Sequence, residues 1–100
     1  MPTLSTHSNV FNTCFLLLKQ LGWRYWVTGK GHESELFWAE RDGWDLTAAS
    51  PIELLGLVMI FEHKKPASYS EYWWRVEGPD LLKAIPTKAP RYHSRTRKPN

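Results

Sequence analysis

The fold of this chain is decided by residues 35–64, whose sequence is ELFWAERDGWDLTAASPIELLGLVMIFEHK. Asp42-Gly43 separates two runs of alternating apolar and polar residues, a pattern typical of a hairpin with a two-residue turn. Such a turn fixes the strand register, which is predicted to pair Arg41 with Trp44, Ala39 with Leu46, and Phe37 with Ala48. These residues share one face of the hairpin, and because they are mostly apolar we expect that face to cover the core.

An unusually apolar helix is predicted directly after the hairpin. Ser50-Pro51-Ile52-Glu53 has the pattern of a capping box, with Pro at the first helical position. The helix is expected to end near Lys64, because Pro66 cannot continue it. Between residues 54 and 61 only Gly56 interrupts the large apolar side chains, so no polar face remains there. We therefore expect burial on more than one side, by a sheet and further helices or by a second subunit.

The residues before this stretch predict a helix and a first strand. The helix begins after Ser8 or Asn9 and ends at Gly22. Residues 23–28 alternate as a strand, and a five-residue loop, Gly29–Glu33, is expected to lead into the hairpin. That loop length predicts the register of the first strand against the hairpin. On the core face, Tyr25 is expected to pair with Phe37 and Trp23 with Ala39. On the outer face, Arg24 is expected to pair with Trp38 and Trp26 with Leu36.

The residues after the central helix carry weaker signals. Ser68–Glu71 is a possible second capping box, so residues 69–77 predict a short helix, with an edge strand as the alternative. The predicted class is α+β, in α-β-β-β-α order: a three-stranded antiparallel meander with helices packed on one face, one or two short C-terminal helices, and a disordered basic tail. The predicted organisation is a single domain over residues 1–85 and a flexible tail over residues 86–100. The double-stranded-RNA-binding domain has the same order of elements. Its second helix is expected to begin with lysines, where this chain has Ser50–Glu53, so the order alone assigns no family.

The composition indicates a small domain with a large aromatic content. The chain has 100 residues, of which 14% are aromatic and six are Trp. The single Cys14 excludes an intramolecular disulfide, and its place on the apolar side of the first helix predicts a small buried hydrophobic residue. No signal peptide is evident at the N-terminus, so an intracellular, cytoplasmic location is expected.

The net charge of +3 arises from the C-terminal end of the chain. No acidic residue follows Asp80, and residues 1–82 carry seven basic and ten acidic residues. The mildly acidic body does not favour a domain built wholly to bind nucleic acid. The tail remains an alternative nucleic-acid site, through a salt-dependent grip on phosphates by Lys88, Arg91, Arg95, Arg97 and Lys98.

Few residues form a pattern that predicts chemistry. Glu40 and Asp45 are expected to lie opposite each other on the outer face, where they could share a proton as the acidic pair of a small enzyme. The more economical interpretation is two solvated carboxylates. The four histidines show no metal-ligand spacing, and no catalytic motif is present. No enzyme activity, cofactor or metal is therefore predicted.

The outer face of the predicted sheet is the strongest candidate for a binding site. Two Trp residues on a solvent face require either a cover, such as residues 69–74, or a partner. The leading hypothesis is a small non-enzymatic interaction protein that acts by protein–protein contact as a homodimer. The predicted partner-binding residues are Arg24, Trp26 and Trp38, with a second aromatic cluster formed by Tyr72, Trp73 and Trp74.

Overall fold

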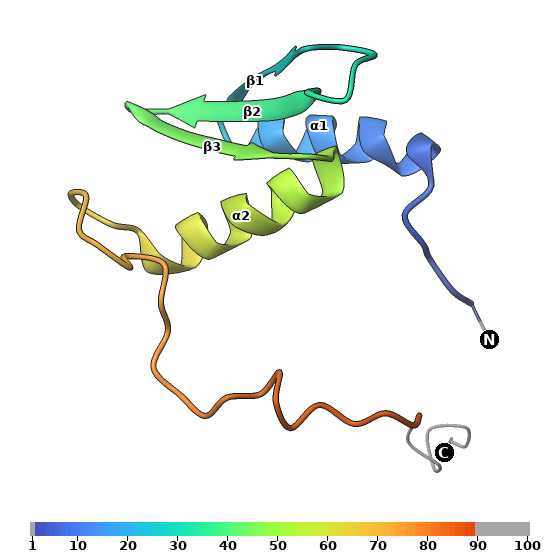
Figure 1. The fold of residues 1–100 in the computed structure, drawn as a ribbon. Coiled ribbons are helices and arrows are strands. Elements are labelled where there is room, and N and C mark those ends of the chain that lie inside the picture. Colours follow the sequence, from blue (N-terminus) through green and yellow to red (C-terminus); the bar gives the residue numbers. More distant parts are fainter. Residues whose placement is uncertain (1, 90–100) are drawn as a thin grey trace.

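The computed structural model describes residues 2–89 and contains two layers. Its elements are η1 (Ser8–Val10), α1 (Phe11–Gln20), β1 (Arg24–Thr28), β2 (Leu36–Arg41), β3 (Trp44–Ala48) and α2 (Pro51–Lys64). The strands form an antiparallel sheet in the order β1-β2-β3. Both α-helices lie under the same face of this sheet (Figure 1). The predicted α-β-β-β-α meander with helices on one face is confirmed.

Local chemistry explains where the helices begin and end. Ser50 is the N-cap of α2, and its Oγ accepts a hydrogen bond of 3.2 Å from the backbone N–H of Glu53. The first helix has no side-chain cap and begins instead through the 3-10 turn of η1. Gly22, with φ of +87°, ends α1. Its N–H donates to the Lys19 carbonyl, and the next N–H donates to the Leu18 carbonyl, which satisfies two carbonyls that the helix leaves unpaired.

The hairpin register is confirmed and the register of the first strand is wrong by two residues. Arg41 pairs with Trp44, Ala39 with Leu46, and Phe37 with Ala48, as predicted. On the other side of β2, Tyr25 pairs with Ala39, Val27 with Phe37, Arg24 with Glu40, and Trp26 with Trp38.

The cause of the shift is a longer loop, which occupies residues 29–35. Two successive turns fold it, closed by hydrogen bonds from His32 N to Gly29 O and from Glu35 N to His32 O. Gly29 is favoured at its start, because its φ is +64° and a Cβ there would lie 3.0 Å from the Ser34 carbonyl oxygen. A shift of two residues leaves every side chain on its predicted face, since strand side chains alternate with a period of two.

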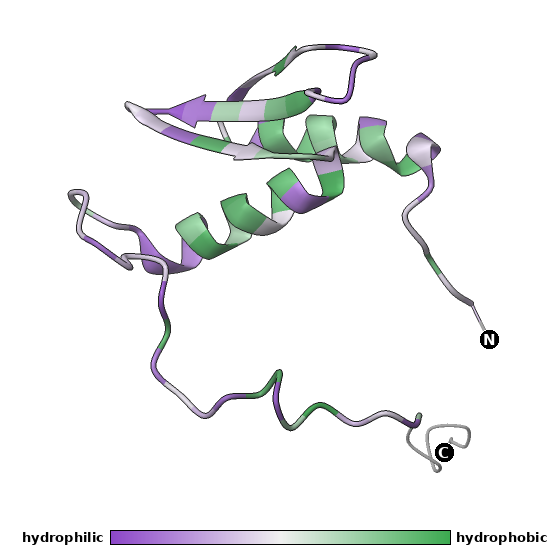
Figure 2. Ribbon diagram, viewed as in Figure 1, coloured by the Kyte–Doolittle hydropathy of each residue, from purple (hydrophilic) through white to green (hydrophobic). Residues whose placement is uncertain are grey.

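The core lies between the sheet and the two helices. Its buried members come from α1, the corner before β1, the inner sheet face and one stripe of α2: Leu18, Trp23, Ala39, Leu46, Leu54, Val58 and Phe61. As expected, α2 packs on the sheet on one side and on α1 on another, but a further apolar side of the helix has no cover among residues 2–89. Leu57, Met59 and Ile60 remain 36%, 58% and 39% exposed, and the middle of α2 is mostly green, the apolar colour, in Figure 2.

The prediction of one or two short C-terminal helices is wrong for the described residues. After α2 the chain forms isolated turns at residues 71–74 and 81–84, with no further helix or strand up to residue 89. Tyr72 has φ of +59°, which breaks a helix at its centre. Trp73 anchors this segment on the core, whereas residues 75–89 are exposed throughout.

Candidate functional site

The outer sheet face carries two tryptophans in a fixed arrangement. Trp26 of β1 lies directly opposite Trp38 of β2, and their ring centroids are 6.0 Å apart with only 3° between the ring planes. The Trp38 Nε1–H donates a 2.9 Å hydrogen bond to the Thr28 Oγ1, which holds that indole in place. Trp26 remains 43% exposed. We call Arg24, Trp26, Thr28, Trp38, Glu40, Asp45 and Thr47 the outer tryptophan face.

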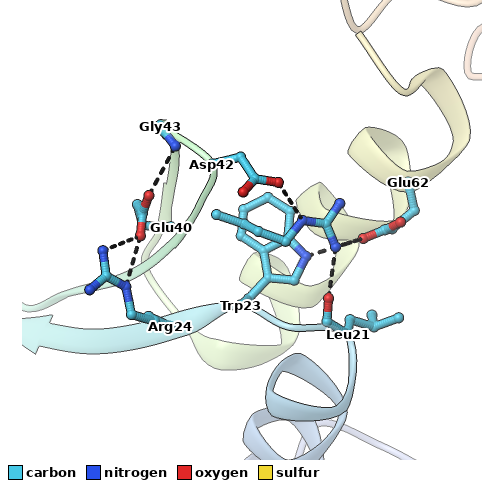
Figure 3. Close-up of polar contacts among 8 residues, drawn as sticks. Leu21, Trp23, Arg24, Glu40, Asp42, Gly43 and Glu62 are labelled. Carbon is cyan, nitrogen blue, oxygen red and sulfur yellow. Dashed lines mark hydrogen bonds and ion pairs between the residues drawn. The ribbon is translucent and has the colours of Figure 1, made fainter. Parts of the chain in front are cut away.

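Glu40 of this face is an ionised partner of Arg24. Its Oε1 accepts from the Arg24 Nε at 2.9 Å and Nη2 at 2.6 Å, and its Oε2 accepts from the Gly43 N–H at 3.0 Å (Figure 3). The Gly43 hydrogen bond, followed by the Arg24 guanidinium, lowers the pKa of Glu40. Asp45 lies opposite Glu40 as predicted. A carboxyl pair that shares a proton would raise the pKa of one member, so the lowered pKa of Glu40 argues against such a pair.

Of the two alternatives for the outer tryptophan face, a cover or a partner, the cover by residues 69–74 is not what the structure shows. Trp73 packs with its ring centroid 5.3 Å from Trp44 and 5.8 Å from Phe61. The Tyr69 ring centroid lies 6.5 Å from that of Trp44. Trp44 is on the inner side of the sheet, because it pairs with Arg41, which lies on the same face of β2 as the buried Ala39. This segment therefore closes one end of the core. Of the outer tryptophan face it approaches Asp45, whereas Trp26 stays 43% exposed.

The second predicted aromatic cluster is divided by the structure. Trp73 is half-buried in the core, whereas Tyr72 and Trp74 are 53% and 48% exposed. The Arg75 guanidinium lies 4.5 Å from the Tyr72 ring centroid and 5.8 Å from that of Trp74. The six predicted partner-binding residues thus belong to two surfaces and, in the case of Trp73, to the core.

An ion-pair network around Arg41 was missed by the sequence analysis. The Arg41 Nη1 donates to the Leu21 carbonyl at 2.7 Å and to the Glu62 Oε2 at 2.8 Å. Its guanidinium carbon lies 4.7 Å from the Trp23 ring centroid. Figure 3 labels the three residues that surround it, Leu21, Trp23 and Glu62. The Trp23 Nε1–H donates to the same Glu62 Oε2 at 3.2 Å. The available signal was the predicted register, which placed Arg41 on an otherwise apolar face.

A groove beside β1 was also missed. It has a volume of about 330 Å³ and is lined mainly by Phe15, Tyr25, Trp26, Val27 and Phe37. Tyr25 is 42% exposed although it lies on the inner face, and its ring stacks on Phe15 at 4.9 Å. Aromatic surface is thus exposed on both faces of β1.

The remaining predictions concern Cys14, metals and the tail. Cys14 is 3% exposed, as predicted for a small buried residue, and burial raises the pKa of its thiol. Within residues 2–89, no group of three or more histidine, cysteine or acidic side chains is placed to hold a metal. Of the predicted nucleic-acid-binding residues, Lys88 is exposed, and the other four, Arg91, Arg95, Arg97 and Lys98, lie outside the described residues.

No helix among residues 2–89 has both the length and the apolar character needed to cross a membrane.

Comparison with known proteins gives no functional assignment. No protein-family model, curated protein or solved structure matches this chain.

Proposed function

We propose that this protein is a non-enzymatic interaction protein that binds a protein partner through the outer tryptophan face and acts as a homodimer. The observation that carries the proposal is the stacked pair of Trp26 and Trp38 on an uncovered sheet face. Aromatic residues and Arg are enriched at protein interfaces and supply most of the binding energy there.

The fixed side chains of this face favour binding without a large entropic cost. Thr28 holds the Trp38 indole and Glu40 holds the Arg24 guanidinium, so two large side chains already occupy defined positions. A partner that contacts them orders few additional rotamers, which preserves affinity.

The charges of this face favour a protein partner over nucleic acid. The Arg24 charge is neutralised by Glu40 at 2.6 Å, and Asp45 adds a further carboxylate directly opposite Glu40. A phosphate backbone would therefore meet more negative than positive charge on this face.

Capture of partners with matched variants tests the proposal. Immobilised full-length protein is exposed to a lysate of its source, and the bound proteins are identified by mass spectrometry. We expect a specific partner that is lost with Trp26→Ala and with Trp38→Ala but retained with Trp74→Ala. Trp74 lies on a different surface and is 48% exposed, close to the 43% of Trp26. Near-ultraviolet circular dichroism verifies that each variant is folded.

The competing hypothesis is a nucleic-acid accessory protein that binds through Lys88, Arg91, Arg95, Arg97 and Lys98. Its support is the concentration of positive charge after residue 82. Deletion of residues 86–100 separates the two hypotheses. If deletion abolishes binding, binding falls steeply with salt, and both outer Trp substitutions have no effect, the tail is the binding site and the proposed function is wrong.

A further inference from the structure

β1 is an edge strand without the usual protection. It pairs with β2 on one side only, and apart from β2 its main packing neighbour is α1 beneath it. Backbone N–H and C=O groups on its other side have no partner among residues 2–89. Natural proteins protect such edges with Pro, bulges, charged residues or a covering segment, and β1, with the sequence RYWVT, has one charged residue and no Pro.

The opposite edge of the sheet is different. There the chain after α2 returns, so that Ser68, Tyr69 and Trp73 line a groove together with Trp44 and Asp45 of β3. Trp73 fixes this segment through its contacts with Trp44 and Phe61. Residues 68–73 thus flank β3, although no backbone hydrogen bond joins them to it. The β1 edge differs because no later segment among residues 2–89 lies beside it.

Apolar side chains surround the free backbone of β1. Trp26 lies on the outer side of the sheet and also lines the groove formed by Phe15, Tyr25, Val27 and Phe37. Lys30 and Glu35, from the loop after β1, complete the lining of this groove. Tyr25 and Trp26 are 42% and 43% exposed. A strand added here would gain main-chain hydrogen bonds and would bury apolar side chains on both faces.

We propose that this edge pairs with the β1 strand of a second copy of the chain, antiparallel, about a two-fold axis at Trp26. This inference rests on the homodimer of the proposed function and assigns its interface. In this register Trp26 lies opposite Trp26 of the partner subunit, Tyr25 opposite Val27 of the partner subunit, and Arg24 opposite Thr28 of the partner subunit. The product is a continuous six-stranded sheet with the helices of both copies on one face.

Self-complementarity identifies the second copy as the occupant. A two-fold axis at Trp26 pairs all five residues of β1 with residues of the other copy. Because the interface is symmetric, each cross-strand contact occurs twice, once from each copy. The only charged residue, Arg24, meets a Thr hydroxyl, and its own charge is already balanced by Glu40. Moving the axis to Arg24 would instead place the two Arg24 side chains opposite each other, which is unfavourable.

The interface would also enlarge the proposed binding surface. Because the two sheets become continuous, the two stacked pairs of Trp26 and Trp38 form one row of four indoles across the dimer. Val27 and Tyr25 of each copy enter the aromatic groove of the other. The partner of the outer tryptophan face would then contact both copies together.

Pairwise cross-linking tests the register. Arg24→Cys and Thr28→Cys are made as separate full-length variants, unfolded and refolded together, oxidised, and analysed on a non-reducing gel. Opposed residues of an antiparallel pair have Cα atoms about 4.5–5.5 Å apart, within disulfide range. Identical residues at position 24 would be about 13 Å apart, four strand positions. We therefore expect a covalent dimer from the mixture and none from either variant alone; the wild type, with Cys14 buried, is the control.

Light scattering and a second cysteine distinguish the possible failures. A monomeric mass at all concentrations overturns both this interface and the homodimer of the proposed function. A dimeric mass without the mixed cross-link, but with a cross-link through Met59→Cys on the exposed face of α2, overturns the strand interface alone. The protein could also be monomeric and capture another protein that is lost when β1 is substituted. That result would show that the β1 edge binds a strand of a different protein, and it would overturn self-pairing.

Discussion

At the scale of single residues, Arg41 shows how one charged side chain joins three parts of the fold. Its guanidinium contacts the end of α1 through the Leu21 carbonyl, α2 through Glu62, and the corner before β1 through the Trp23 ring. The side chains of Arg41 and Glu62 are each only 26% exposed. Removing one partner would leave the other partly buried without its countercharge.

Arg41→Ala is expected to lower the free energy of unfolding by about 2 kcal/mol, because it removes a half-buried ion pair and leaves the Leu21 carbonyl and the Glu62 carboxylate with fewer hydrogen bonds. Arg24→Ala is the matched control, since it breaks an ion pair whose Arg is 82% exposed. Urea unfolding followed by Trp fluorescence measures both. Equal destabilisation by the two variants would contradict the assigned role of Arg41.

The stability contributed by Glu62 is expected to depend on pH. The Trp23 indole N–H, then the hydrogen bond and charge of Arg41, lower its pKa below the ordinary value of 4.5. A carboxyl with a lowered folded-state pKa stabilises the protein above its unfolded pKa, and this contribution is lost as the pH falls through the folded pKa. The stability difference between wild type and Glu62→Gln should be largest at neutral pH and should narrow below pH 4.5. Urea midpoints measured across this range check the trend, which a difference independent of pH would contradict.

At the scale of elements, α2 has two apolar sides with different roles. Pro51, Leu54, Val58 and Phe61 form the buried stripe that packs on the sheet and α1. Leu57, Met59 and Ile60 lie outside it. The sequence does not distinguish the two sides, because both carry large aliphatic residues. The sheet and α1 select one of them.

Leu54 and Leu57 provide a matched test of this difference. Leu54 is 0% exposed and Leu57 is 36% exposed. We expect Leu54→Ala to cost about 3 kcal/mol of unfolding free energy and Leu57→Ala less than about 1 kcal/mol. Denaturant unfolding measures both, and light scattering of Leu57→Ala should give an unchanged mass if β1 forms the dimer. A monomeric Leu57→Ala would place the interface on α2.

The N-cap of α2 is a third element-level feature. Ser50→Ala removes the hydrogen bond from the Glu53 N–H, so a loss of about 1 kcal/mol of unfolding free energy is expected. Ser50→Asp is the control, because Asp caps equally well and should restore stability. Thermal unfolding of both variants measures the effect, and equal losses in the two would argue against a capping role.

At the scale of the whole molecule, the packed body ends at the turn around Trp73. This side chain contacts Trp44 and Phe61, whereas no residue from 75 to 89 is buried. The chain leaves the two layers after this point and extends away from them (Figure 1).

Deletion of residues 78–100 is therefore expected to change the unfolding free energy by less than about 0.5 kcal/mol, since the deleted part has no buried side chain among its described residues. Trp73→Ala is expected to cost about 3 kcal/mol, because it opens the end of the core. Urea unfolding compares the two, with Trp74→Ala as the exposed-Trp control. A large loss on truncation would show that the extended segment packs on the body.

The sequence by itself determined the features that depend on neighbouring residues. The Asp42-Gly43 turn, the Ser50 cap, the Gly22 helix end and the alternation of the strands set the elements from α1 to α2, their order, the hairpin register and the face of every strand residue. Each depends on backbone conformation or hydrogen bonds within a few positions.

Only the tertiary structure decided contacts between distant residues. The β1–β2 register depended on turns inside the loop at residues 29–35. The place of residues 69–74 depended on the fit of Trp73 against Trp44 and Phe61. For the same reason the sequence predicted which residues form the outer tryptophan face, but not their contacts. Three features required the tertiary structure: the exposure of this face, the Arg24–Glu40 pair and the free edge of β1. Such contacts depend on packing across the whole chain, which no local pattern encodes.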